Sequence, residues 1–187
     1  TVLDSDVTDD NGAYDVTVDS ETDVRIRAQA ALVSTSGAVW DVRVRDNTNS
    51  NSLYALGGSL TTSGVADSTR NLNAASGWTG SAYTQTRAAA PFAILDGIYE
   101  ALTDFAAVDP AINAPNLQVF WSTQNRAASG NVANGEIGTS SYTQIGGVPT
   151  VLVLGDADND TDEYDIHVIV HEFGHYFEDQ LSRSDST

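Results

Sequence analysis

The amino-acid sequence predicts an α+β fold in which strands come first and helices later. Apolar and polar residues alternate through much of residues 14–44, as they do in strands with one buried face. Apolar residues recur at helical spacing in residues 87–108, and a second helix is expected from about residue 162. These patterns divide the chain into a small β-sandwich, a connecting segment and a region that carries both helices.

The first region, residues 1–58, is expected to form the β-sandwich. Alternation predicts its strands at residues 14–18, 24–32 and 38–44, with a short addition at 53–56. Turn sequences of the kind found in hairpins precede the first strand and separate the next two, namely Asp10-Asn11-Gly12 and Ser36-Gly37. Three or four meandering strands with one apolar face imply a small sandwich.

Residues 59–86 are rich in Gly, Ser, Thr and Asn without sustained periodicity, which predicts a linker or surface loop. The third region, residues 87–187, begins with the first helix, and Asp109-Pro110 is expected to end that helix. Apolar runs at 117–121 and 148–154 predict two strands before the second helix.

A zinc site is indicated by the run His171-Glu172-Phe173-Gly174-His175 in the second helix. Histidines at i and i+4 project from one helical face, close enough for both rings to bind one Zn²⁺. The glutamate after the first histidine is then placed to reach a metal-bound water and act as general base. Residues 168–177 contain no charge other than Glu172, so the helix has an uncharged frame.

Two other interpretations concern the same histidines. An amphipathic core helix with two ordinary surface histidines would also give this pattern. All three histidines of the chain, His167, His171 and His175, fall in this helix at four-residue spacing. His167 is not expected to bind the same ion, because each step of four residues climbs about 6 Å along the helix. It is interpreted as structural, or as an outer partner of the site.

A catalytic zinc needs three protein ligands, and the third is not evident in this chain. After His175 the acids are Glu178, Asp179 and Asp185. Glu178 and Asp179 lie on the same helix and cannot swing back across it, and Asp185 is too near the helix end. We therefore expect the third ligand to lie outside the chain.

An acidic loop precedes the motif helix. Its aspartates occupy alternate positions, as in a calcium loop where carboxylate oxygens wrap the cation: Asp156, Asp158, Asp160 and Asp162. The match is incomplete, because position six is Thr161 instead of glycine and position twelve is His167 instead of glutamate. The loop is thus either a calcium site or an acidic turn that complements the dipole of the helix.

The chain is strongly acidic, with 26 Asp and Glu against 8 basic residues, all arginine, and a net charge of −18. Such a surface repels nucleic acid and anionic lipid, so both are excluded as partners. Abundant aspartate without lysine is typical of a saline or marine bacterial or archaeal source. The absence of cysteine rules out a disulfide framework and says little about compartment.

The 187 residues begin at Thr1 and include no methionine, so we expect a processed or cut piece of a longer protein. No apolar run reaches the length of a membrane span, and no signal peptide remains at the start.

The stretch from Arg87 onward, above all LGDADNDTDEYDIHVIVHEFGHYFEDQLSRSDS, resembles the zincin metallopeptidase-type domains of large secreted or lipid-anchored proteins of marine bacteria. The resemblance implies that residues 87–187 form an incomplete N-terminal lobe, and that a glutamate in a later helix is the third ligand, as in gluzincins. Residues 1–58 resemble a truncated carboxypeptidase-regulatory-like, transthyretin-type β domain, in which TDDNGAYDVTV matches the usual turn and strand.

The resemblance and the motif chemistry together predict a fragment of a secreted, extracellular zinc metalloendopeptidase. His171 and His175 would bind zinc, Glu172 would be the catalytic base, and peptides or proteins would be the substrates. The strand at 148–154 is expected to border the cleft and pair with an extended peptide. The isolated chain is expected to be inactive without the C-terminal part of its parent.

The competing prediction is a non-catalytic subunit of an extracellular surface or fibre that retains a zincin-like fold. A β domain without its first strands exposes a sheet edge, and such an edge accepts a strand from a neighbouring copy. The two predictions differ in whether zinc is bound with a third protein ligand.

Overall fold

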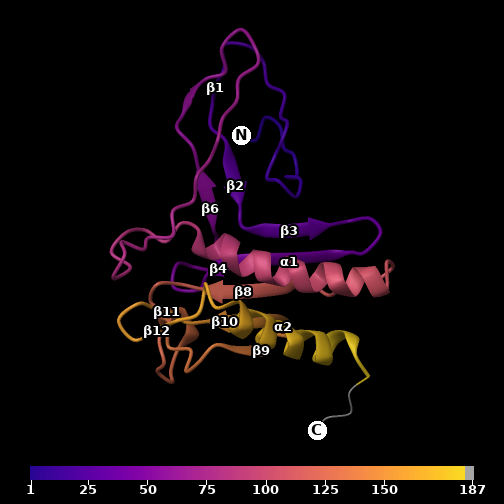
Figure 1. Ribbon diagram of the computed structural model, residues 1–187, viewed down its shortest axis with the longest axis vertical. Helices are drawn as coiled ribbons and strands as arrows, with labels where there is room; N and C mark the ends of the chain where they lie inside the picture. Colours follow the sequence, from indigo (N-terminus) through magenta and orange to yellow (C-terminus); the bar gives the residue numbers. More distant parts are fainter. Residues whose placement is uncertain (184–187) are drawn as a thin grey trace. The chain divides into compact units, whose positions relative to one another are not determined.

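The computed structural model describes residues 1–183 and has a mixed α+β fold, mostly sheets with two α-helices in this range (Figure 1). The predicted α+β class is therefore confirmed. The chain forms two compact units. The first comprises residues 1–28 and 56–73, and the second comprises residues 29–55 and the chain from residue 74 onward. Within residues 1–183, neither α-helix is both long and apolar enough to cross a membrane.

The second unit is built on one mixed sheet with the strand order β3-β4-β8-β10-β9. In that order its strands are Ala31–Ser34, Trp40–Asp46, Leu117–Trp121, Val148–Val153 and Ser141–Ile145. Strand β8 pairs in parallel with both β4 and β10, whereas β3 and β9 pair antiparallel with their neighbours. The short β5 (Ser52–Leu53) also pairs with β4.

Two helices lie on one face of this sheet. Helix α1 (Ala90–Val108) packs against β3 and β4, and α2 (Ile166–Leu181) packs against β9 and β10 (Figure 1). The helices also pack against each other, and Gly97 permits this close approach. A Cβ at Gly97 would lie 3.2 Å from Cγ1 of Ile166, tighter than ordinary van der Waals contact.

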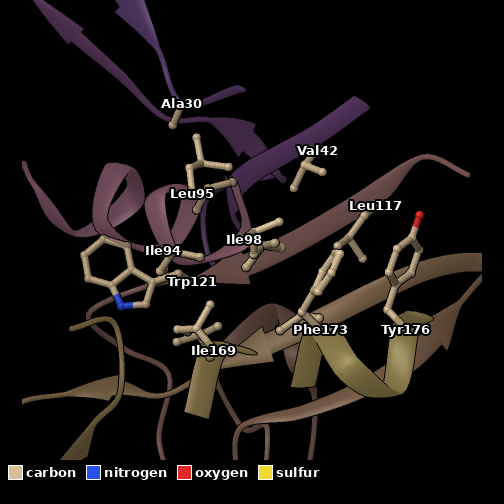
Figure 2. Close-up of a cluster of buried hydrophobic side chains, with 14 of the residues drawn as sticks. Ala30, Val42, Ile94, Leu95, Ile98, Leu117, Trp121, Ile169, Phe173 and Tyr176 are labelled. Carbon is tan, nitrogen blue, oxygen red and sulfur yellow. The ribbon is translucent and has the colours of Figure 1, made fainter. Parts of the chain in front are cut away.

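The core of the second unit lies between the helices and the sheet. Alternate residues of β8, namely Leu117, Val119 and Trp121, face the helices, as do Val151 and Val153 of β10. Figure 2 shows Ile94, Leu95 and Ile98 of α1 and Ile169, Phe173 and Tyr176 of α2 entering this cluster. Each fully buried apolar side chain of this size contributes about 1.5–3 kcal/mol, so this packing dominates the stability of the unit.

The opposite face of the sheet carries a smaller cluster. Phe120 and Leu152 point to this side and pack with Ile137 and Leu154. The long segment between β8 and β9, which includes the short 3-10 helix η1 (Val132–Asn134), supplies Ile137 and covers these residues. The sheet is therefore buried on both sides where β8 and β10 meet.

The first unit contains little regular structure. Its strands β1 (Asp23–Val24) and β7 (Thr61–Thr62) form a two-stranded sheet. Strands β2 (Arg27–Gln29) and β6 (Ala55–Gly57) form another, and in the second unit β11 (Gly155–Asp156) pairs with β12 (Asp160–Thr161).

The strand predicted at residues 14–18 is wrong, because no strand forms there. Aspartate side chains hold its backbone instead. The N–H groups of Ala13, Asp15 and Thr17 donate to the carboxylates of Asp9, Asp6 and Asp4, at 2.8, 2.7 and 2.7 Å. Carboxylates therefore occupy the positions that a neighbouring strand would take.

The division of the chain differs from the predicted boundaries at residues 58 and 86. Residues 31–46 pair with β8 in the main sheet rather than in a separate sheet. The strands expected at 38–44, 117–121 and 148–154 and both helices are present, with the bounds given above. Strand β9 had no predicted counterpart.

Candidate metal centre

The packing of α2 determines where the histidines point. Ile169, Phe173 and Tyr176 form the buried stripe of this helix at spacings of four and three residues. His171 and His175 each follow a buried residue by two positions. Each histidine is therefore rotated by about 200° around the helix axis from a core-facing residue. Both histidines are accordingly exposed. The core stripe thus presents the predicted ligand pair to solvent.

The two imidazole rings approach each other through their Nε2 atoms. Their Nε2 atoms lie 3.2 Å apart, and the ring planes are nearly perpendicular at 88°. Two nitrogens bound to one tetrahedral Zn²⁺ at about 2.0–2.1 Å would lie about 3.3–3.4 Å apart. The observed separation is close to that value, and it is also the distance of a hydrogen bond between the two rings.

Glu172 is half-buried and turns towards strand β9. Its Oε2 accepts a hydrogen bond from the backbone N–H of Tyr142 at 2.8 Å. Oε1 forms no hydrogen bond with any residue in the range 1–183. One carboxylate oxygen is thus fixed by the protein, and the other has no hydrogen-bond partner among the described residues.

Strand β9, rather than β10, is the edge strand beside the motif. We predicted that residues 148–154 border the cleft, but β10 lies between β8 and β9 and is paired on both sides. The N–H of Tyr142 points away from β10, because it donates to Glu172. The backbone edge near the candidate site therefore belongs to β9.

The start of α2 is fixed by an N-cap. Asp165 Oδ1 accepts hydrogen bonds from the backbone N–H groups of His167 and Val168, at 3.0 and 3.3 Å. A cap of this kind stabilises a helix by about 1 kcal/mol. His167 itself is exposed one turn before His171, and it stays interpreted as structural or as an outer partner.

A buried ion pair anchors the segment that leads into α2, and no local sequence pattern indicates it. Glu163 pairs with the guanidinium of Arg87, which also donates to the carbonyl of Gly155. The Nε1–H of Trp121 donates to the other oxygen of Glu163 at 3.3 Å. The Arg87 guanidinium also lies 5.2 Å from the Tyr83 ring centroid and 5.4 Å from that of Trp121.

Within residues 1–183, no three His, Cys, Asp or Glu side chains are grouped so that they could hold a metal ion. Glu178 is exposed on α2, and Asp179 accepts hydrogen bonds from Tyr142, Gln144 and Gln180. Asp185 lies outside the described residues. That the third zinc ligand comes from elsewhere in the parent stays a prediction.

The four aspartates of the predicted calcium loop lie around a tight hairpin. Asp156 and Asp160 are paired across β11 and β12, and Asp158 is exposed at the turn. Asp162 Oδ2 accepts a hydrogen bond from Ser140 Oγ at 2.5 Å. Partial burial raises the pKa of Asp162 above its ordinary value. The hairpin does not arrange these carboxylates as a ligand group, and calcium binding stays a prediction.

Strand β9 did have a signal in the sequence. Gly146-Gly147 lies between β9 and β10, and both glycines have positive φ, at 60° and 78°. Two-residue turns of this kind connect antiparallel strands. The turn, together with Tyr142, Thr143 and Ile145, was sufficient to predict a hairpin.

Comparisons of the chain with protein-family models, with curated proteins and with solved structures found no match.

Proposed function

We propose that this chain carries part of the active site of a zinc-dependent metallopeptidase, with His171 and His175 as two of the zinc ligands and Glu172 as the general base. The 3.2 Å separation of the two Nε2 atoms is the observation that carries the proposal. The same distance also suits a hydrogen bond between the two rings, and the metal titration below distinguishes that contact from a shared ion.

Zinc bound there would lower the pKa of a coordinated water to about 7 and polarise the carbonyl of a peptide. Glu172 takes the proton from the attacking water at Oε1, the oxygen that Tyr142 leaves free. The same carboxyl then passes that proton to the leaving amine. The two histidines would hold the ion, as neutral ligands, on the exposed face of α2.

A zincin-like N-terminal lobe is the finer fold that we propose for the second unit. A motif helix packed against a sheet, with an edge strand beside the catalytic glutamate, supports it. A third ligand from another part of a secreted parent would complete the site. The transthyretin-type sandwich proposed for residues 1–58 has weaker support, because residues 31–46 pair within the main sheet.

The alternative function is a non-catalytic extracellular subunit that assembles by strand pairing. The observation in its favour is that β3 is the other edge of the main sheet and exposes 38 % of Val33. An accessible apolar edge is a site where a second copy can add a strand.

Metal titration with matched histidine variants tests the proposal. Co²⁺, a spectroscopic substitute for Zn²⁺, should give ligand-field absorption with the wild-type chain, and Zn²⁺ should displace it. His171→Ala and His175→Ala should abolish this absorption, whereas His167→Ala, at an exposed position on the same helix, should retain it. Equal spectra for all three variants would reject the metal centre. Sedimentation of the metal-free protein as a concentration-dependent oligomer would then favour the alternative.

A further inference from the structure

We infer that Tyr142 of β9 is a positioning residue for Glu172, and that Asp179 holds Tyr142 in place. This inference rests on the proposed function, because it assigns a role in orienting the general base of that reaction. It adds a contact outside the histidine motif, from a strand that the sequence pattern did not identify.

The spacing on α2 makes this contact possible. Glu172 and Asp179 are seven residues apart, so they lie on nearly the same side of the helix, two turns or about 10 Å apart. Tyr142 reaches both of them. Its backbone N–H donates to Glu172 Oε2 at 2.8 Å, and its hydroxyl donates to Asp179 Oδ2 at 2.6 Å. A single residue of the edge strand therefore joins both positions of this helical face.

Asp179 is held by more than Tyr142. The side-chain amides of Gln144 and Gln180 also donate to its Oδ2, at 2.9 and 2.7 Å. The hydrogen bond from Tyr142 is the main cause that lowers the pKa of Asp179, and partial burial raises the pKa of Tyr142 to about 12. At neutral pH the donor therefore keeps its proton and the acceptor keeps its charge.

The ring of Tyr142 is also fixed by packing. Its centroid lies 6.1 Å from that of Tyr176, in an edge-to-face arrangement with an interplanar angle of 71°. Tyr176 is buried, and its hydroxyl donates to the carbonyl of Pro115. The hydroxyl and the ring of Tyr142 are thus both held, which fixes the position of the backbone N–H that binds Glu172.

A fixed N–H restricts the rotamers of Glu172. With Oε2 tied to Tyr142, Oε1 is the oxygen that is left to accept a proton. Loss of the Tyr142 hydroxyl keeps the backbone N–H as a donor. It removes the hydrogen bond to Asp179 that holds this residue, and therefore its N–H, in position. Because small misplacements of a catalytic group cost up to about a hundredfold in rate, we expect a loss in kcat rather than in zinc affinity.

The first arm of the test measures hydrogen exchange of the Tyr142 amide in this chain. Tyr142→Phe removes the hydroxyl and keeps the ring, and Asp179→Asn removes the charge of the acceptor. Both should speed exchange of the residue 142 amide by about tenfold or more, because a weakly held hydrogen bond opens more often. Thr143→Val, on the same strand but outside this network, is the control and should leave that amide unchanged. Unchanged exchange in folded Tyr142→Phe would overturn the inference.

The second arm uses the complete, zinc-loaded parent protein with the same variants, because the isolated chain is expected to be inactive. Tyr142→Phe should lower kcat about tenfold with KM and zinc content unchanged, which a purely structural contact would not do. An active wild type with an unaltered kcat in Tyr142→Phe would overturn the inference and leave the proposed function standing. A zinc-loaded complete parent that cleaves no peptide would overturn both.

Discussion

Arg87 and Glu163 form an ion pair in which both side chains are almost fully buried, with exposed fractions of 4 % and 0 %. Arg87 lies three residues before α1, and Glu163 lies two residues before Asp165, the N-cap of α2. The pair therefore ties together the starts of the two helices that form the core. Its hydrogen bonds to Gly155 and Trp121 satisfy further groups of the buried cluster.

We expect Glu163→Gln and Arg87→Met each to destabilise the fold by about 3–5 kcal/mol, because each leaves one buried charge without its partner. Chemical denaturation of the metal-free chain measures this change. The double variant Arg87→Met/Glu163→Gln should lose less than the sum of the two single losses. Strictly additive losses would show that the two charges do not interact.

The isolated chain should bind Zn²⁺ weakly, because two histidines alone leave the ion with one protein ligand too few. Isothermal titration at neutral pH should give a binding curve that His171→Ala eliminates and His167→Ala preserves. Tight, stoichiometric binding by the wild-type chain would contradict the prediction that the third ligand lies outside it.

In the complete parent, Glu172→Gln should abolish peptide hydrolysis and leave the zinc bound. The substitution removes the base and spares both histidine ligands. Metal analysis and a peptidase assay on the same preparation make the comparison. His175→Ala should instead lose the metal itself. Similar activity in the wild type and Glu172→Gln would favour the non-catalytic alternative.

Asp162→Asn should stabilise the chain at neutral pH. The folded-state pKa of Asp162 is raised above its ordinary value, mainly by partial burial, so its ionisation favours the unfolded chain. The penalty is absent below the unfolded pKa and appears as the pH rises through it. Thermal melts should therefore show a higher midpoint for Asp162→Asn at pH 7 and no difference near pH 2.5. A lower midpoint at pH 7 would contradict this assignment.

Calcium should reverse that order if the acidic loop binds it. Millimolar Ca²⁺ would then raise the midpoint of the wild type more than that of Asp162→Asn, because the variant lacks one of the four carboxylates. Magnesium at the same concentration is the control for general screening. Equal shifts with both ions would leave the loop as an acidic turn before α2.

Local patterns predicted those elements whose apolar residues recur with a clear period. The runs in β8 and β10 and the stripe of α2 have this property, and they set the positions of His171 and His175. Strand β9 was missed because its residues are mostly polar, although the Gly146-Gly147 turn marked it. The contact between Tyr142 and Glu172 joins residues 30 positions apart, so no local pattern contains it.

The division of the chain into two units could not be predicted from the periodicity of apolar residues, for a similar reason. Strand β4 pairs in parallel with β8, although more than seventy residues separate Val42 from its partner Leu117. Alternating apolar and polar residues indicate a strand with one buried face, but they do not identify the strand with which it pairs. The alternation at residues 14–18 gave a wrong strand, because nearby aspartates supply the acceptors that a neighbour would have provided.

Those aspartates have a consequence for self-association. The N–H groups of Ala13, Asp15 and Thr17 already donate to charged carboxylate oxygens, so they cannot pair with a strand of another molecule. The negative charge also repels the carbonyl oxygens of such a strand. The same hydrogen bonds lower the pKa of Asp4 and Asp9, chiefly through Thr17 and Ala13, which keeps these two carboxylates charged in mild acid. The aspartate side chains thus protect the N-terminal segment against strand pairing with another molecule. This protection lasts as long as the carboxylates remain ionised.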